Sequence, residues 1–245
     1  MRLNTEFRKI KKNEFDDLEF LYSKLEEKPT VIFDCGANIG FVSYQFYKRF
    51  PSSHIYAFEP NPDIFSKLHK NTRKEQIKTF QVGVGNSESK IEFYKNNNSG
   101  TSSFFEPNEF HLANLARKYK KVKVPVISID SFCVKNSINE ISILKLDIEG
   151  YELKALEGCE KMLEKKKIDF ILTEVSLVPV YKDQSLIEDI IKYLRNYNYV
   201  LFNFYGNNET KLRESLLTNL LFVSEKTAEK LEAKLGRNSI FTYKK

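Results

Sequence analysis

The stretch VIFDCGANIG, residues 31–40, decides the fold of this chain. An apolar run ends there in an acid and a glycine, and a helical pattern follows from Ile39 to Phe50. Such a run is typical of a buried parallel strand that turns directly into a helix. The same alternation returns along the chain, which predicts an α/β fold. Further strands are expected at 54–59, 77–84, 141–147, 169–176, 199–205 and 218–224, and further helices at 15–25, 62–69, 111–119, 151–163, 185–195 and 227–236.

The length of the chain, 245 residues, suits one domain with a single hydrophobic core. We expect residues 1–28 to form an N-terminal helical extension and residues 29–245 to form that domain. The rhythm of strands and helices breaks at about residues 85–124, where two strands, 89–96 and 122–130, are separated by a polar stretch. Long loops in compact domains are often functional. The segment is therefore predicted to be an insert that covers the substrate.

The composition favours a cytoplasmic protein. The chain has 39 Lys and Arg against 33 Asp and Glu, a net charge of +6, and its 41% of hydrophobic residues excludes a disordered chain. Cys35, Cys133 and Cys159 lie far apart without metal-binding spacing, so we expect reduced, buried thiols. The N-terminus has no apolar signal segment, and no apolar run approaches the roughly 20 residues of a membrane span. We therefore expect neither export nor a membrane span.

The glycine loop at the end of the first strand indicates the ligand. Its pattern is acid-x-Gly-x-Asn-x-Gly, from Asp34 through Gly36 and Asn38 to Gly40. A dinucleotide-binding loop GxGxxG started at Gly36 would need glycines where this chain has Asn38 and Phe41. The two glycines allow the backbone to approach a ligand, and the Asp34 carboxylate suits an ammonium group better than a pyrophosphate. S-adenosylmethionine carries an amino group and a sulfonium but no phosphate, so it is the expected ligand.

A second acid fits the same ligand. Glu59 ends the second strand within AFEP, residues 57–60. A carboxylate at that place can accept hydrogen bonds from both hydroxyls of a ribose. Acids at strand ends also often cap the following helix. The glycine loop and Glu59 occur in the expected order, each at a strand end, and together they predict a nucleoside-binding site.

Four segments resemble the FkbM family of S-adenosylmethionine-dependent methyltransferases. They are DCGANIG, AFEP, ISILKLDIEGYELKALEG and FILTEVS, and the resemblance extends from about residue 31 to about residue 205. The block KLDIEGYE, residues 145–152, is the most specific part. The resemblance implies a class I methyltransferase fold, which is Rossmann-like, with a seven-stranded, mostly parallel sheet and helices on both faces. It also implies further cofactor contacts at Pro60, Gly83, Ser102 and Asp147.

The expected chemistry is an in-line displacement at a sulfonium, in which an attacking hydroxyl loses its proton to a base or is activated by a metal. Candidate bases opposite the glycine loop are Asp147, Glu149 and Glu174, of which Asp147 or Glu174 is the expected base, with His111 of the insert as an alternative. Lys145 could pair with one of these acids. Asp147 and Glu174 also resemble the carboxylates that hold Mg²⁺ in catechol-type O-methyltransferases, although no third ligand of that pattern is evident.

The resemblance implies methylation of a hydroxyl on a sugar or secondary metabolite. We expect the acceptor to be a sugar, nucleotide-linked, that serves as a precursor of a surface polysaccharide. Alternatives are another small acceptor, such as a secondary-metabolite hydroxyl, an amine or a phosphoryl-linked group, and a protein that only binds the cofactor. An RNA methyltransferase is disfavoured, because residues 147–150 lack the Asn/Asp-Pro-Pro-aromatic motif of base-methylating enzymes and no basic, aromatic platform is visible. We therefore expect no nucleic-acid partner, while a homodimer stays open.

Overall fold

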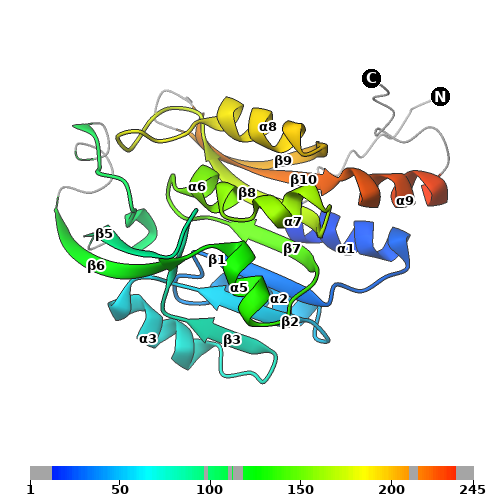
Figure 1. Cartoon of the computed structure of the whole chain (residues 1–245), viewed down its shortest axis with the longest axis horizontal. Coiled ribbons are helices and arrows are strands. Elements are labelled where there is room, and N and C mark those ends of the chain that lie inside the picture. Colours follow the sequence, from blue (N-terminus) through cyan, green and yellow to red (C-terminus); the bar gives the residue numbers. More distant parts are fainter. Residues whose placement is uncertain (1–12, 97–98, 110–111, 113–117, 210–214, 236–245) are drawn as a thin grey trace, which may run out of the picture.

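A seven-stranded sheet runs through the molecule (Figure 1). The computed structural model describes residues 13–96, 99–109, 112, 118–209 and 215–235. The strand order is β3-β2-β1-β7-β8-β10-β9, and β10 runs antiparallel to both of its neighbours in an otherwise parallel sheet. The strands are β1 (Val31–Cys35), β2 (His54–Phe58), β3 (Ile77–Phe80), β7 (Ile141–Leu146), β8 (Ile168–Ser176), β9 (Tyr199–Glu209) and β10 (Ser215–Ser224). This order confirms the predicted seven-stranded, mostly parallel α/β sheet.

Helices cover both faces of the sheet, and each face has its own hydrophobic core (Figure 1). Alternate residues of each strand supply the two cores: Ile32 of β1 faces one and Phe33 faces the other. The first face carries α1 (Glu14–Leu25), α2 (Phe41–Arg49), α3 (Pro62–Asn71) and α9 (Glu225–Leu235). The second carries α5 (Ile129–Lys135), α6 (Glu152–Glu157), α7 (Glu160–Glu164) and α8 (Ile187–Asn196).

The first helix, α1, packs on the sheet. Its N-terminus is closed by a capping box, in which the Asn13 side chain accepts from the backbone of Asp16 and the Asp16 side chain accepts from the backbone of Asn13. Leu21 and Tyr22 are buried in the first core, and the Tyr22 hydroxyl donates to the Ser142 carbonyl at 2.9 Å. Residues 14–25 of the expected extension are therefore part of the same core as the sheet.

The insert forms a second sheet beside the first. Its three strands lie in the order β4 (Gly83–Val84), β6 (Tyr119–Ile127) and β5 (Ser89–Asn96), and a short 3-10 turn, η1, covers Ser99–Thr101. The single strand expected at 77–84 is wrong, because β3 and β4 belong to different sheets. Gly83 lies so close to the Phe104 ring that a Cβ atom there would be 2.3 Å from Phe104 Cζ. Glycine at residue 83 therefore allows the chain to pack against Phe104 of the insert.

The end of one strand and the course of one helix also differ from those expected. The strand expected to reach residue 130 ends at Ile127, because Ser128 caps α5 by accepting from the Ser131 backbone N–H at 3.2 Å. The helix expected at 151–163 is divided into α6 and α7 at Gly158. A Cβ at Gly158 would lie 2.0 Å from the Gly85 carbonyl oxygen, so the close approach of the insert requires glycine there.

The helix expected at 111–119 lies mostly outside the described residues, and Tyr119 is in β6.

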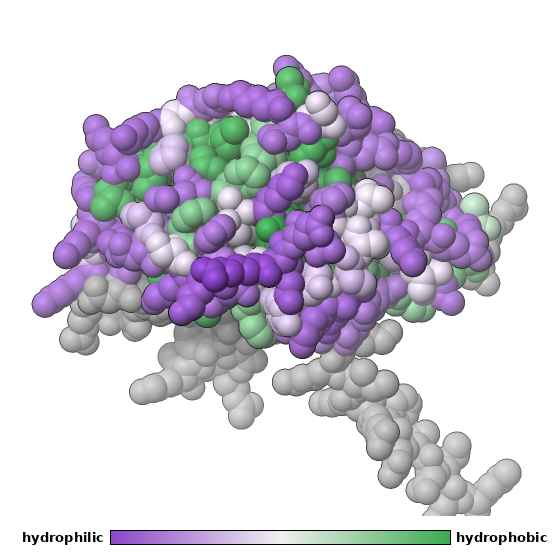
Figure 2. All heavy atoms as spheres, turned by 90° about the horizontal axis from the view of Figure 1, so that it is seen from below, coloured by the Kyte–Doolittle hydropathy of each residue, from purple (hydrophilic) through white to green (hydrophobic). Residues whose placement is uncertain are grey.

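Figure 2 shows hydrophilic residues over most of one face, with apolar residues between them. The cysteines are as expected, since all three are free and buried. Among the described helices, none has the length and apolar character that a membrane span requires.

Candidate active site

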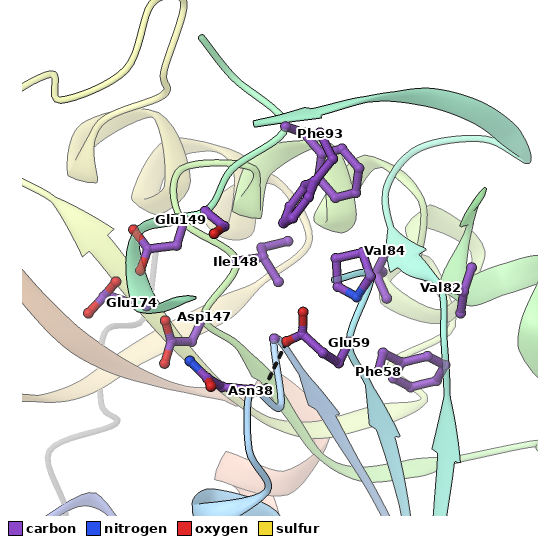
Figure 3. Close-up of a pocket in the computed structure, with 16 residues that line it drawn as sticks. Asn38, Phe58, Glu59, Val82, Val84, Phe93, Asp147, Ile148, Glu149 and Glu174 are labelled. Atoms are coloured by element: carbon purple, nitrogen blue, oxygen red, sulfur yellow. Dashed lines mark hydrogen bonds between the residues drawn. The ribbon is translucent and has the colours of Figure 1, made fainter. Parts of the chain in front are cut away.

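A cavity of about 250 Å³ opens at the carboxyl ends of the central parallel strands (Figure 3). Ligands of open α/β sheets bind at this edge. The cavity is lined by the glycine loop, the ends of β2 and β7, the start of the insert and the 3-10 turn. Nine of the residues expected at the site line it: Gly36, Asn38, Glu59, Pro60, Gly83, Ser102, Asp147, Glu149 and Glu174. Asp34 and Gly40 do not line it, and His111 lies outside the described residues.

The glycine loop packs directly on the turn after β7. Gly36 has a φ of +81°, and a Cβ there would lie 1.8 Å from the Asp147 carbonyl oxygen. The Asp147 backbone N–H donates to the Cys35 carbonyl at 3.1 Å, which continues the pairing of β1 with β7 past the strand ends. Glycine at residue 36 therefore brings the loop and Asp147 to one wall of the cavity.

Asp34 has a different role from the one expected. It is fully buried below the loop, where its Oδ2 accepts from the Ser43 hydroxyl at 2.5 Å and its Oδ1 lies 3.2 Å from Lys145 Nζ. The reason is strand register: Asp34 on β1 pairs with Lys145 on β7, so both side chains point to the face covered by α2. The contact expected between Asp34 and the amino group of the cofactor is replaced by this ion pair.

Lys145 joins two carboxylates at the base of the site. Its Nζ lies 3.2 Å from Asp34 Oδ1 and 3.1 Å from Asp147 Oδ2, and the lysine is buried. Burial by itself lowers the pKa of Lys145, but the carboxylates of Asp147 and Asp34 outweigh it and hold the pKa above its usual range. Lys145 is thus a fixed positive charge that orients Asp147 from below.

Glu59 stands at the end of β2 with both carboxylate oxygens held by backbone groups. Oε2 accepts from the Asn38 N–H at 3.0 Å (dashed in Figure 3), and Oε1 accepts from the Asn61 N–H at 2.8 Å. Burial raises the pKa of Glu59 to about 7, although these two hydrogen bonds favour the ionised form. Because each carboxylate oxygen can accept two hydrogen bonds, the fixed group can still accept from a ligand.

Three carboxylates meet on the opposite wall (Figure 3). Asp147, Glu149 and Glu174 each offer an oxygen within 4.8 Å of the other two. Burial raises the pKa of Glu149, and the charges of Glu174 and Asp147 raise it further. Burial and the charge of Asp147 likewise raise the pKa of Glu174. The wall therefore combines an acid paired with Lys145 and two acids that hold a proton more tightly than usual.

Glu152 shapes the turn that presents Glu149. Glu149 and Gly150 have φ angles of 56° and 94°, in the left-handed region. The Glu152 carboxylate is buried, and its Oε1 accepts from the backbone N–H groups of Ile148 at 2.9 Å and Gly150 at 3.2 Å. Glu152 therefore holds the turn that presents Glu149, a role that was not predicted from the sequence.

Prediction for Lys145: replacement by methionine leaves Asp34 and Asp147 without the cation that neutralises them. Removing one partner of a buried ion pair typically costs about 3–5 kcal/mol, so we expect Lys145→Met to lose free energy of unfolding of that order in urea titrations. The matched control is Lys135→Met, which breaks an exposed pair with Glu88 and should change little. Adding Asp34→Asn to Lys145→Met should recover part of the loss. Equal stability of Lys145→Met and the control would contradict the role of the buried cation.

Comparison with known proteins identifies the family. The family model of the methyltransferase FkbM domain matches residues 34–201. Hexuronic acid methyltransferase AglP from Haloferax volcanii is 26% identical over 200 residues, which cover 78% of this chain and 77% of that protein. The 31-O-demethyl-FK506 methyltransferase FkbM from Streptomyces tacrolimicus is 25% identical over 173 residues, which cover 60% of this chain and 66% of that protein.

A solved methyltransferase structure also aligns with most of this chain. Magnesium protoporphyrin IX methyltransferase ChlM from Synechocystis PCC 6803, with bound SAM, aligns with 86% of this chain and 77% of its own length at a TM-score of 0.48 and 10% identity. The family model spans more than half of the present chain. The chain therefore belongs to the FkbM family and is an S-adenosylmethionine-dependent methyltransferase.

Proposed function

We propose that this enzyme transfers the methyl group of S-adenosylmethionine to a hydroxyl of a sugar, with a nucleotide-linked sugar as the acceptor and a surface polysaccharide as its destination. The observation that carries the proposal is the cavity itself, which has Glu59 on one wall and the three carboxylates Asp147, Glu149 and Glu174 on the other. The similarity to a hexuronic acid methyltransferase supports a sugar-derived acceptor.

The wall formed by the glycine loop and the end of β2 suits the cofactor. The carboxylate of Glu59 accepts the ribose hydroxyls, and the apolar side chains of Phe58, Val82 and Val84 contact the adenine ring. Asn38, Pro60, Gly83 and Ser102 complete this part of the site. Asp34 contributes indirectly, because its carboxylate pairs with Lys145 and Lys145 in turn pairs with Asp147.

The acidic wall suits a hydroxyl nucleophile. In the displacement, the acceptor oxygen forms a bond to the methyl carbon, the bond from carbon to sulfur breaks, and the hydroxyl proton moves to a carboxylate. Glu149 and Glu174 are suited to accept that proton because burial raises the pKa of each carboxyl above its usual range. A carboxylate nucleophile would be repelled by the same wall, so the geometry favours a methyl ether as the product over a methyl ester.

The experiment that tests this function offers the enzyme UDP-glucose, UDP-N-acetylglucosamine and UDP-glucuronic acid with S-adenosylmethionine, and detects methylated products by mass spectrometry. We expect a product that survives mild alkali, because a methyl ether resists hydrolysis and a methyl ester does not. In the same assay Glu149→Gln and Glu174→Gln should reduce turnover about 10²- to 10⁴-fold and leave the Kd of the cofactor nearly unchanged.

The control for these variants is Glu157→Gln, which removes a charge on α6 outside the cavity. Full activity in both Glu149→Gln and Glu174→Gln would contradict the proposal that one of these carboxylates is the base. Absence of methylation of all three sugars would contradict the proposal that the acceptor is a nucleotide-linked sugar.

Prediction for pH: the affinity for S-adenosylhomocysteine should rise as the pH increases through about 7, the pKa of Glu59 in the free protein. Below that pH the Glu59 carboxyl is protonated. The ribose hydroxyls donate better to the ionised carboxylate, so binding of the ligand releases a proton in this pH range. Above it, the affinity should level off. Calorimetry between about pH 5.5 and 8.5, in buffers of different ionisation enthalpy, measures both the Kd and the proton release. Glu59→Gln should bind more weakly and show no such dependence; a pH profile shared by both proteins would contradict the contact.

A divalent cation at the acidic wall is the second candidate mechanism. The donor set fits Mg²⁺, because Asp147, Glu149 and Glu174 supply carboxylate oxygens that lie close together. Glu149 would be the third ligand, for which the sequence showed no candidate. Such an ion would lower the pKa of a bound hydroxyl and neutralise the charge of the wall.

Chelation distinguishes the two mechanisms. If a cation is required, exhaustive EDTA treatment should abolish turnover, added Mg²⁺ should restore it, and the Kd for S-adenosylhomocysteine should stay the same because Glu59 lies on the other wall. Turnover that survives EDTA excludes the metal and leaves a carboxylate as the base.

A further inference from the structure

Two segments far apart in sequence lie together beside the acidic wall. One follows the 3-10 turn of the insert, residues 101–108, and the other follows β8, residues 177–184. We call them together the cover. An isolated β-bridge between Pro107 and Tyr181 joins the two segments. The Lys182 N–H donates to the Glu106 carbonyl at 2.8 Å. Asn108 makes two further hydrogen bonds, from its N–H to the Val180 carbonyl at 3.3 Å and from its side chain to the Pro179 carbonyl at 2.8 Å.

Tyr181 reaches from the cover to the acidic wall. Its side chain is buried, with 2% exposure, and its hydroxyl lies 2.8 Å from Glu149 Oε2 and 3.3 Å from the Thr101 carbonyl oxygen. Both partners are acceptors, and a tyrosine hydroxyl has one proton to donate. The shorter distance and the charge of the carboxylate assign the donated hydrogen bond to Glu149. A phenol is protonated at neutral pH, so this hydroxyl has its proton to donate.

Gln184 fixes the backbone of Tyr181. Its Oε1 accepts from the N–H groups of Val180 at 2.9 Å and Tyr181 at 3.2 Å, and its Nε2 donates to the Ser176 hydroxyl at 2.5 Å. The Gln184 side chain also lies against Gly150, where a Cβ would be 2.9 Å from Nε2. Through Gln184, the backbone of Tyr181 is therefore tied to the end of β8 and to the same turn that presents Glu149.

We propose that Tyr181 is a positioning residue, which fixes one oxygen of Glu149 through its hydroxyl and leaves the other oxygen for the acceptor. The proposal rests on the proposed function, and it selects Glu149 from the three carboxylates as the group that the cover orients. The Ser103 hydroxyl supports this arrangement, because it donates to the Glu149 carbonyl at 2.7 Å and so ties the insert to the backbone of the same residue.

The test compares Tyr181→Phe with Tyr199→Phe. Tyr199 is also buried, and its hydroxyl donates to the Ile168 carbonyl at 2.8 Å, away from the cavity. Each variant loses one buried hydroxyl, so their thermal stabilities should fall by similar amounts. We expect Tyr181→Phe to lower kcat about 10- to 100-fold, in keeping with loss of a hydrogen bond to a charged group, with the KM for S-adenosylmethionine unchanged. Tyr199→Phe should keep the kcat of the original enzyme. An equal kcat in both variants overturns the proposal.

A double-mutant cycle tests whether Tyr181 acts through Glu149. Tyr181→Phe should cause no further loss of kcat in the Glu149→Gln background, and an undiminished additional loss would overturn the positioning role. If Glu149→Gln is fully active, the proposed base is wrong. If Glu149→Gln is impaired and Tyr181→Phe is not, only the present inference fails.

A crystal structure of Tyr181→Phe with S-adenosylhomocysteine gives a readout that needs no acceptor. The Glu149 carboxylate should leave the position that it occupies beside Tyr181, whereas the backbone of the cover, held by Gln184, should stay unchanged. An unmoved Glu149 carboxylate would show that the hydroxyl does not position it.

Discussion

The site depends on one buried positive charge, the ammonium group of Lys145, which lies between the carboxylates of Asp34 and Asp147. A charge is stable at such depth only when it is paired, so the three groups must come together as β1 and β7 align. That alignment also places Gly36 against the Asp147 carbonyl, at a distance that no side chain would permit. The glycine loop and the acidic wall are therefore held in fixed relative positions by this strand pairing, and an in-line displacement requires such fixed positions.

The sheet and nine of the residues that line the cavity could be predicted from the sequence because both depend on local patterns. Buried parallel strands are apolar runs, and in such a sheet the ligand binds at their carboxyl ends. Glu59 and Asp147 were found in this way, each as the acid that follows a strand. The role of Asp34 could not be predicted, because it depends on the register between β1 and β7, which more than a hundred residues separate in the chain. Register is a tertiary property, and here it turned an expected ligand contact into an ion pair.

The errors in the fold have a related cause. The strand at 77–84 and the helix at 151–163 are continuous in their local pattern, yet both are interrupted where distant segments touch: Phe104 against Gly83, and Gly85 against Gly158. Tyr181 and Gln184 were missed for the same reason. Their neighbours in sequence form a loop without regular pattern, and their functional contacts are with Glu149 and with the end of β8. Residues that complete a site by closing one segment onto another leave no periodic signal.

The charge of the site bears on the relative affinities for the methyl donor and the spent cofactor in the proposed reaction. In that reaction S-adenosylmethionine would bring a sulfonium cation to a wall with three carboxylates and one lysine at its base, so the donor would be attracted electrostatically. Methyl transfer neutralises the sulfur, and the released proton neutralises a carboxylate that already has a raised pKa, such as Glu149. Both changes remove the attraction that held the donor. The acidic wall would consequently bind the spent cofactor less tightly than the donor, while the ribose would keep the same proposed partner, Glu59. On this proposal, donor discrimination lies with Glu149 and its neighbours, and nucleoside recognition lies with Glu59.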